Sequence, residues 1–204
     1  MKRIFYPLFL TLLVVQTSAC APMLIGSAAV ASKVAIDRRT AGIQLEDEGI
    51  ELRTASGLRA QLPRNTNVRI SSYNRLVLIT GEVNNESERL QVERFVKSQD
   101  NVKSVVNDLI ISPESSLTQR AQDTLITTKI RALLIQAKDI HSSAVNIVTE
   151  RGVVYLMGRL TPREANRVAE LIRTSNIAGL QKVVKVFETI SEEDLSRLVA
   201  PSRP

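Results

Sequence analysis

Apolar and polar residues alternate with a period of two in two pairs of short segments. In each pair the two segments are separated by a short polar run, a pattern that predicts a β-hairpin. The segments are 68–70 with 76–81, and 145–147 with 153–158. Asn74 and Gly152 lie in the polar runs and suit the positive φ angles of a tight hairpin turn. In both pairs a Val precedes a Gly by thirteen residues, so the chain contains an internal repeat.

Helical periodicity surrounds each predicted hairpin. A helix is expected before each hairpin, a second helix after it, and then a closing strand. The expected helices are 46–62, 86–98, 119–138 and 162–174, and the closing strands are 102–111 and 180–190. Thr161 suits a helix cap and Pro162 suits the first helical turn. The predicted order is therefore α-β-β-α-β, twice, in an α+β fold.

The first nineteen residues have the pattern of a secretory signal peptide. Lys2 and Arg3 form a positive region, an apolar run follows, and small residues lead into Cys20, the only cysteine. This arrangement resembles a bacterial lipobox, which implies that Cys20 is lipidated and becomes the new N-terminus. The alternative is ordinary cleavage nearby, which leaves a spectator thiol. By resemblance to enterobacterial sorting rules, Ala21 after the cysteine favours the outer membrane.

These patterns predict five further segments after the signal peptide. A lipidated tether covers 20–39, and the two repeats cover 40–112 and 118–190. A short Ser- and Pro-containing linker, 113–117, separates the repeats. The last segment, 191–204, ends in two prolines and a serine among four residues and is predicted to be disordered.

The repeats carry residues typical of a known family. Each hairpin ends in a short apolar segment and a glycine, Gly81 or Gly158, and the first closing strand runs from Val102 to Leu109 with valines at its centre. This resembles the BON domain. Two such domains behind a lipobox resemble the outer-membrane, lipid-binding lipoproteins of Gram-negative bacteria. The resemblance implies two helices packed on a three-stranded mixed sheet in each domain, and a role in envelope integrity.

Residues able to support catalysis or bind a metal are few. His141 is the only histidine, in a polar turn where a solvated side chain is the expected state. The acidic run Glu46, Asp47 and Glu48 is expected to favour a helix N-terminus through the helix dipole, not to bind a metal. Gly81 and Gly158 are expected to be structural, allowing a bend or a close helix–sheet approach. The sequence predicts no enzyme, cofactor or metal site.

Charge distinguishes the two repeats. Residues 40–112 hold nine Lys and Arg against ten Asp and Glu, a balance of −1, whereas residues 118–190 hold eleven against six, a balance of +5. The basic repeat suits an anionic partner. Nucleic acid is disfavoured because the chain carries an export signal and only 3% aromatic residues for stacking on bases. Anionic phospholipids, such as phosphatidylglycerol or cardiolipin, fit better.

The helix expected at 119–138 sharpens this prediction. Ile126, Ile130 and Leu134 fall on the face that should cover the sheet. Other side chains lie off that face or at its margin and combine apolar tips with basic groups, which suits shallow insertion into an anionic membrane. The predicted phospholipid-binding residues are Leu125, Thr128, Lys129, Arg131 and Ile135. The alternative is that Leu125 or Ile135 packs against the first repeat or a dimer partner.

At the level of function, the alternative is a non-catalytic protein–protein scaffold for envelope assembly. Its partners would be outer-membrane assembly or division proteins, with the basic helix as the interface. The first repeat is expected to act as a scaffold or partner-binding module in either case.

Overall fold

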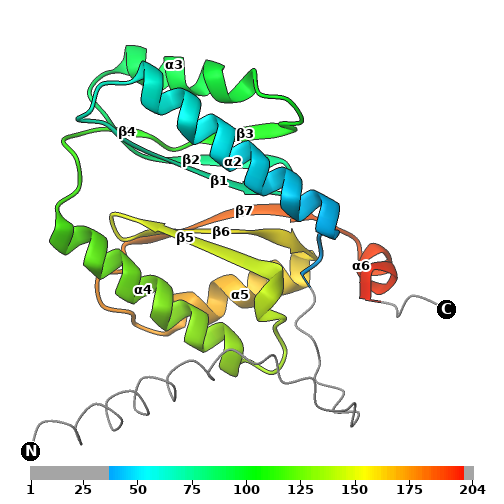
Figure 1. Cartoon of the computed structure of the whole chain (residues 1–204). Coiled ribbons are helices and arrows are strands. Elements are labelled where there is room, and N and C mark those ends of the chain that lie inside the picture. The colour runs from blue at the N-terminus through cyan, green and yellow to red at the C-terminus, as the bar shows by residue number, and fades with distance from the viewer. Residues whose placement is uncertain (1–36, 200–204) are drawn as a thin grey trace, which may run out of the picture. The chain divides into compact units, whose positions relative to one another are not determined.

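The computed structural model describes residues 37–199, which belong to one compact unit spanning 35–204 (Figure 1). The signal peptide and Cys20 lie outside the described residues. The first module, residues 41–111, and the second module, residues 117–189, both follow the predicted α-β-β-α-β order, with the closing strand of the first divided in two, so the α+β fold is confirmed. The elements are α2 (Ala41–Gln61), β1 (Asn67–Tyr73), β2 (Leu76–Val83), α3 (Glu86–Lys97), β3 (Ser104–Asn107), β4 (Ile110–Ile111), α4 (Leu117–Gln136), a short 3-10 turn (Ser142–Ala144), β5 (Val145–Glu150), β6 (Val153–Leu160), α5 (Pro162–Thr174), β7 (Lys182–Thr189) and α6 (Glu192–Val199).

In the first module, α2 and α3 cover one face of a sheet that has β2 at its centre (Figure 1). β1 pairs with β2 antiparallel, and β3 and β4 both pair with β2 in parallel. The predicted closing strand is thus two pieces. Between them, Leu109 is buried in the helix–sheet core, and its N–H donates a hydrogen bond to the side-chain oxygen of Asn107.

The second module repeats this arrangement with an unbroken closing strand. β5 pairs antiparallel with β6, and β7 pairs with β6 in parallel along its whole length. Ile126, Ile130 and Leu134 of α4 meet α5 and the sheet in one core, which confirms the predicted inner face of α4. Thr161 caps α5 and Pro162 occupies its first turn, as predicted.

Both hairpins close through turns with two successive positive φ angles. These are 53° at Asn74 and 65° at Arg75 in the first module, and 52° at Arg151 and 75° at Gly152 in the second. This pattern defines the type I′ turn, whose twist matches that of the paired strands. Asn74 and Gly152 therefore hold the conformation that the sequence predicted.

Gly81 and Gly158 lie close to the backbone at or just before the start of the strand with which each pairs. A Cβ atom built on Gly158 would lie 2.3 Å from the carbonyl oxygen of Ala144, and one on Gly81 would lie 1.9 Å from that of Asn67. Because a glycine has no Cβ atom, the backbone at each position can lie against the carbonyl oxygen of the neighbouring segment without a clash. The close neighbour is this backbone and not a helix, so the close helix–sheet approach, one of the two roles expected from the sequence, is not what the glycines permit.

The second face of each sheet is also buried. Tyr73 and Leu78 from the first module form one apolar cluster with Tyr155, Met157 and Val186 from the second. The Tyr155 hydroxyl donates a 2.7 Å hydrogen bond to Asp108 at the border of this cluster. Because both faces of each sheet are covered, the exposed outer surface of each module is largely that of its helices.

Residues just before α2 are bound to both modules, although the sequence placed them in the tether. The side chain of Arg38 is only 2% exposed and pairs with Glu164 of α5 through contacts of 2.6 and 2.8 Å. Burial alone would raise the pKa of Glu164. Hydrogen bonds from Arg38 and the Thr161 N–H, with the charge of Arg38, outweigh burial and hold this pKa below its usual value. Arg39 pairs with Asp47 of the first module at 2.8 Å.

The prediction of disorder from residue 191 onward is wrong for the part of this segment that the structure describes. Glu192–Val199 form the helix α6. The Ser191 hydroxyl accepts a hydrogen bond from the Asp194 N–H at 3.0 Å, and acidic residues occupy the first turn. These local signals favour a helix N-terminus, and they precede the prolines on which the prediction of disorder rested.

We expect Gly158→Ala to lower the free energy of unfolding by roughly 1–3 kcal/mol, because the added methyl group forces the strand backbone to shift. Gly42→Ala is the matched control, since a Cβ atom on Gly42 meets nothing within 4 Å. This control should leave stability unchanged or raise it by up to about 1 kcal/mol. Thermal melts of both variants measure the difference, and equal melting temperatures would show that Gly158 is incidental.

Candidate functional site

Helix α4 carries all five residues that the sequence predicted for phospholipid binding. The helix begins after Ser116, whose hydroxyl accepts the Gln119 N–H while the Gln119 side chain accepts the Ser116 N–H. This reciprocal cap fixes the start of the helix. The inner face is then held by Ile126, Ile130 and Leu134, each no more than 1% exposed. The opposite face is left to solvent.

The five predicted side chains are all exposed. Leu125 is 61% exposed and Ile135 is 66% exposed, so neither packs against the first module. Leu117, which was not among the predicted residues, is 82% exposed at the start of the same helix. These apolar side chains lie on one stripe with small residues, at intervals of three or four positions. The apolar stripe consists of Leu117, Ala121, Leu125, Thr128, Ala132 and Ile135. Its spacing was visible in the sequence.

Basic side chains lie on both sides of the apolar stripe. At 100° per residue, Lys129 falls on one side and Arg131 on the other. Neither makes an ion pair with any carboxylate in residues 37–199. The outer face of α4 therefore combines exposed apolar groups with unneutralised positive charge.

The corresponding helix of the first module, α2, provides a natural comparison. Leu45 and Leu52 on α2 are 70% and 73% exposed, as much as the apolar residues of α4. However, α2 contains four acidic and two basic residues, a balance of −2, whereas α4 contains one acidic and three basic residues, a balance of +2. The two helices carry similarly exposed apolar side chains but opposite net charge, so only α4 suits an anionic surface.

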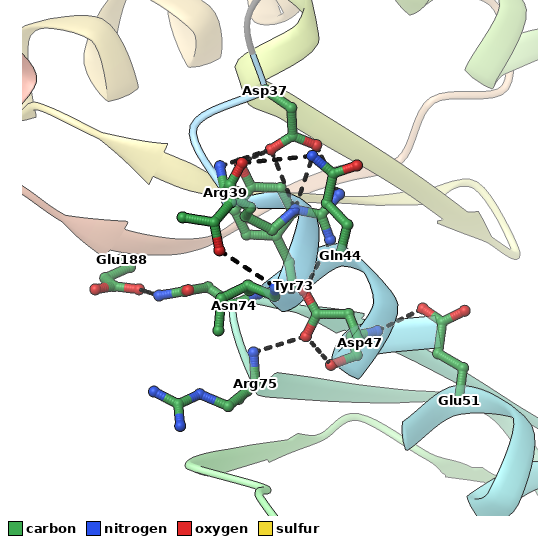
Figure 2. Close-up of polar contacts among 12 residues, drawn as sticks. Asp37, Arg39, Gln44, Asp47, Glu51, Tyr73, Asn74, Arg75 and Glu188 are labelled. Atoms are coloured by element: carbon green, nitrogen blue, oxygen red, sulfur yellow. Dashed lines mark hydrogen bonds and ion pairs between the residues drawn. The ribbon is translucent and has the colours of Figure 1, made fainter. Parts of the chain in front are cut away.

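A buried aspartate ties the first helix of each module to its hairpin. In the first module, Asp47 accepts the N–H groups of Asn74 and Arg75, both at 2.8 Å, as Figure 2 shows. In the second, Asp123 accepts the N–H groups of Arg151 and Gly152 at 2.8 and 2.7 Å. Asp123 thereby fixes the rotation of α4 on the sheet, and with it the direction of the apolar stripe.

This role corrects the interpretation of the acidic run at 46–48. The helix begins at Ala41 and has no acidic residue in its first turn, so the run does not stabilise a helix N-terminus. Asp47 is 2% exposed and also accepts the Ser72 hydroxyl at 2.7 Å and the Arg39 guanidinium (Figure 2). Arg39 in turn lies over the Tyr73 ring, 4.2 Å from its centroid. Asp47 precedes Asn74 by 27 residues and Asp123 precedes Arg151 by 28, a repeat signal in the sequence that could have identified both aspartates.

Residues 37–199 show no candidate metal site. No group of three or more histidine, cysteine or acidic side chains lies close enough to hold a metal ion in that part of the chain. His141 is exposed, just before the 3-10 turn. None of the helices in the described range is long and apolar enough to cross a bilayer.

Known proteins resemble the chain over most of its length. The BON domain family matches residues 47–113 and 122–190. "Outer membrane lipoprotein DolP" of Haemophilus influenzae is 34% identical over 171 residues, which cover 83% of this chain and 88% of that protein. "21 kDa hemolysin" of Actinobacillus pleuropneumoniae is 31% identical over 157 residues, 76% of this chain and 80% of its own length. A solved structure of CdsD, described as a structural protein of the type III secretion system of Chlamydia trachomatis, has 15% identity and a TM-score of 0.31, covering 74% of this chain and 99% of its own.

We expect Asp123→Ala to lower the free energy of unfolding by roughly 3 kcal/mol, because the two turn N–H groups lose their acceptor. Asp139→Ala is the matched control, since Asp139 is 54% exposed and pairs only with Arg167 at the surface. The control should change stability by less than about 1 kcal/mol. Urea unfolding curves give both values. Equal losses for the two variants would mean that the hairpin does not depend on Asp123.

Proposed function

This chain is an outer-membrane lipoprotein of the BON domain family, and from that premise we propose that it binds anionic phospholipids through α4 and so supports envelope integrity. The observation that carries the proposal is the apolar stripe of α4 with its unneutralised basic flanks. We further propose that the anchor is a lipid on Cys20 and that the described modules face the periplasm. The families that the chain resembles are non-catalytic, and the proposal includes no catalytic step.

Two physical contributions make α4 a membrane-binding surface. Attraction between basic residues and an anionic surface contributes on the order of 1 kcal/mol for each residue near the surface, and salt weakens it. Exposed apolar side chains then enter the interface, where burial of a Leu or Ile side chain stabilises the bound state by roughly 1.5–3 kcal/mol. Charge therefore selects the lipid, and the apolar stripe prolongs the contact.

A protein–protein role has its own supporting observation. Leu45 and Leu52 lie exposed on the acidic helix α2, which repels an anionic membrane but suits a protein partner. Outer-membrane assembly or division proteins are the partners proposed for this surface. The two functions separate experimentally, because lipid binding follows the fraction of anionic headgroups and falls as ionic strength rises.

The lipid site is tested with residues 35–204, which form one compact unit, and with vesicles of phosphatidylcholine containing phosphatidylglycerol or cardiolipin. Leu125→Gln/Ile135→Gln should weaken sedimentation with these vesicles by more than about tenfold, because two apolar side chains no longer enter the interface. The matched control is Leu45→Gln/Leu52→Gln on α2, which removes equally exposed apolar groups from the acidic helix.

The control pair should bind the anionic vesicles like the unmodified protein. Circular dichroism checks that both double variants remain folded. We expect them to fold because all four substituted side chains are exposed. If the α4 pair binds normally, or if the two pairs lose binding equally, α4 is not the lipid site. The protein–protein role then becomes the leading hypothesis.

The anchor is tested separately in the full chain with Cys20→Ser. A serine hydroxyl does not replace the thiol in lipid attachment, so we expect unprocessed precursor or a form released from membranes without detergent. Fractionation of Gram-negative cells and labelling with a fatty-acid analogue measure both results. A mature, labelled, membrane-bound variant would contradict lipidation of Cys20.

A further inference from the structure

A groove of about 670 Å³ runs between α2 of the first module and α4 of the second. Its floor is formed by β1 and β5, which are both edge strands of their sheets. The groove was not visible in the sequence, because its two sides belong to different repeats. Its basic lining residues are Arg59, Arg69, Arg120 and Arg131.

Two of these arginines have no counter-charge within residues 37–199. Arg69 lies 3.2 Å from a Glu150 carboxylate oxygen, and Arg120 pairs with Glu114. By contrast, Arg59 of α2 and Arg131 of α4 make no ion pair in that range. Each module therefore contributes one free guanidinium to the same groove.

The acidic lining of the groove does not neutralise these charges. Asp123 is the only carboxylate among the lining residues, and its two oxygens already accept the N–H groups of the second hairpin turn. The hydroxyls of Thr124 and Thr128 donate to helix carbonyl oxygens, and those of Thr127 and Thr149 bond to each other. The donors left for a ligand are chiefly the guanidinium groups, which bind phosphate oxygens in pairs.

The groove adjoins the apolar stripe of α4. Thr128 belongs to the stripe and also lines the groove. Arg131 lines the groove as well as a smaller cleft of about 250 Å³ that contains Ile135. A molecule with an anionic phosphate and an apolar tail can therefore contact the groove and the stripe together, which free inorganic phosphate cannot.

We propose that this groove binds the phosphate of an anionic phospholipid headgroup, with Arg59 and Arg131 as its ligands. The inference rests on the proposed function of α4 and adds a binding residue from the first module. The first module then takes part in lipid recognition, beyond the scaffold or partner-binding role that the sequence suggested. A headgroup held between the modules also requires them to keep their mutual packing.

The test uses residues 35–204 and vesicles of phosphatidylcholine with a fixed fraction of phosphatidylglycerol. Arg59→Gln should weaken binding about tenfold, the loss expected when a charge-assisted hydrogen bond to phosphate is removed. Arg94→Gln is the matched control. It removes the same charge from an exposed arginine on α3 that makes no ion pair within residues 37–199 and does not line the groove, and it should weaken binding by less than about threefold.

Arg131→Gln tests the groove from the side of α4, and the double variant tests whether both arginines bind one phosphate. In that case the two losses are not independent, so the double variant should bind more strongly than the product of the single losses predicts. Circular dichroism establishes that the variants are folded. Should Arg59→Gln fail to fold, Arg59→Lys replaces it, with an expected loss smaller than that of Arg131→Gln but larger than that of Arg94→Gln.

The outcomes separate this inference from the function on which it rests. If the unmodified protein does not bind the anionic vesicles, both are overturned. If the α4 pair Leu125→Gln/Ile135→Gln loses binding while Arg59→Gln behaves like Arg94→Gln, the groove site is wrong and the α4 site stands. A titration with inorganic phosphate, followed by NMR, distinguishes the source of the phosphate. If Arg59→Gln alters only that titration and not vesicle binding, the groove binds a free anion and the lipid assignment is overturned.

Discussion

A single carboxylate on the first helix of each module connects its helix to its hairpin. Asp47 and Asp123 are buried, and each satisfies two N–H groups of a type I′ turn that would otherwise lack an acceptor. Leaving such groups unsatisfied costs roughly 1–3 kcal/mol each, a large part of the net stability of a small domain. Because this bond sets the rotation of the helix, it determines which side chains of α2 and α4 reach the sheet and which reach solvent.

Burial of both sheet faces then restricts where binding can occur. The helix-facing residues fill one core in each module, and the opposite faces share the cluster around Tyr155 and Met157. Helix surfaces and the groove between modules remain available. The two repeats differ there in charge, since α2 has a balance of −2 and α4 of +2. The two modules thus share the arrangement of their interiors but differ in the charge of their first helices.

The sequence predicted those features that depend on local pattern. The period-two alternation located both hairpins, Asn74 and Gly152 identified their turns, and the 3.6-residue period assigned Ile126, Ile130 and Leu134 to the core. It could not predict features that depend on a distant partner. An acidic run looks the same whether Asp47 caps a helix or a hairpin, and Arg38 resembles any basic residue of a tether until Glu164 lies beside it. The groove required both repeats to be placed in space, and it follows from no pattern in either one.

A lipid anchor changes what a binding surface on α4 has to achieve. An anchored protein is already confined to the membrane, so a second contact is in effect intramolecular and operates at a high effective concentration. A weak contact is then sufficient, and its strength can respond to the headgroups present without controlling whether the protein stays at the membrane. Arg59 and Arg131, which make no ion pair within residues 37–199, suit such a contact because their attraction to a membrane depends on anionic lipid and is screened by salt. The short apolar stripe adds a limited area of burial to it. In the function that we propose, adhesion depends on a lipid at Cys20, and lipid discrimination depends on α4 and the groove beside it.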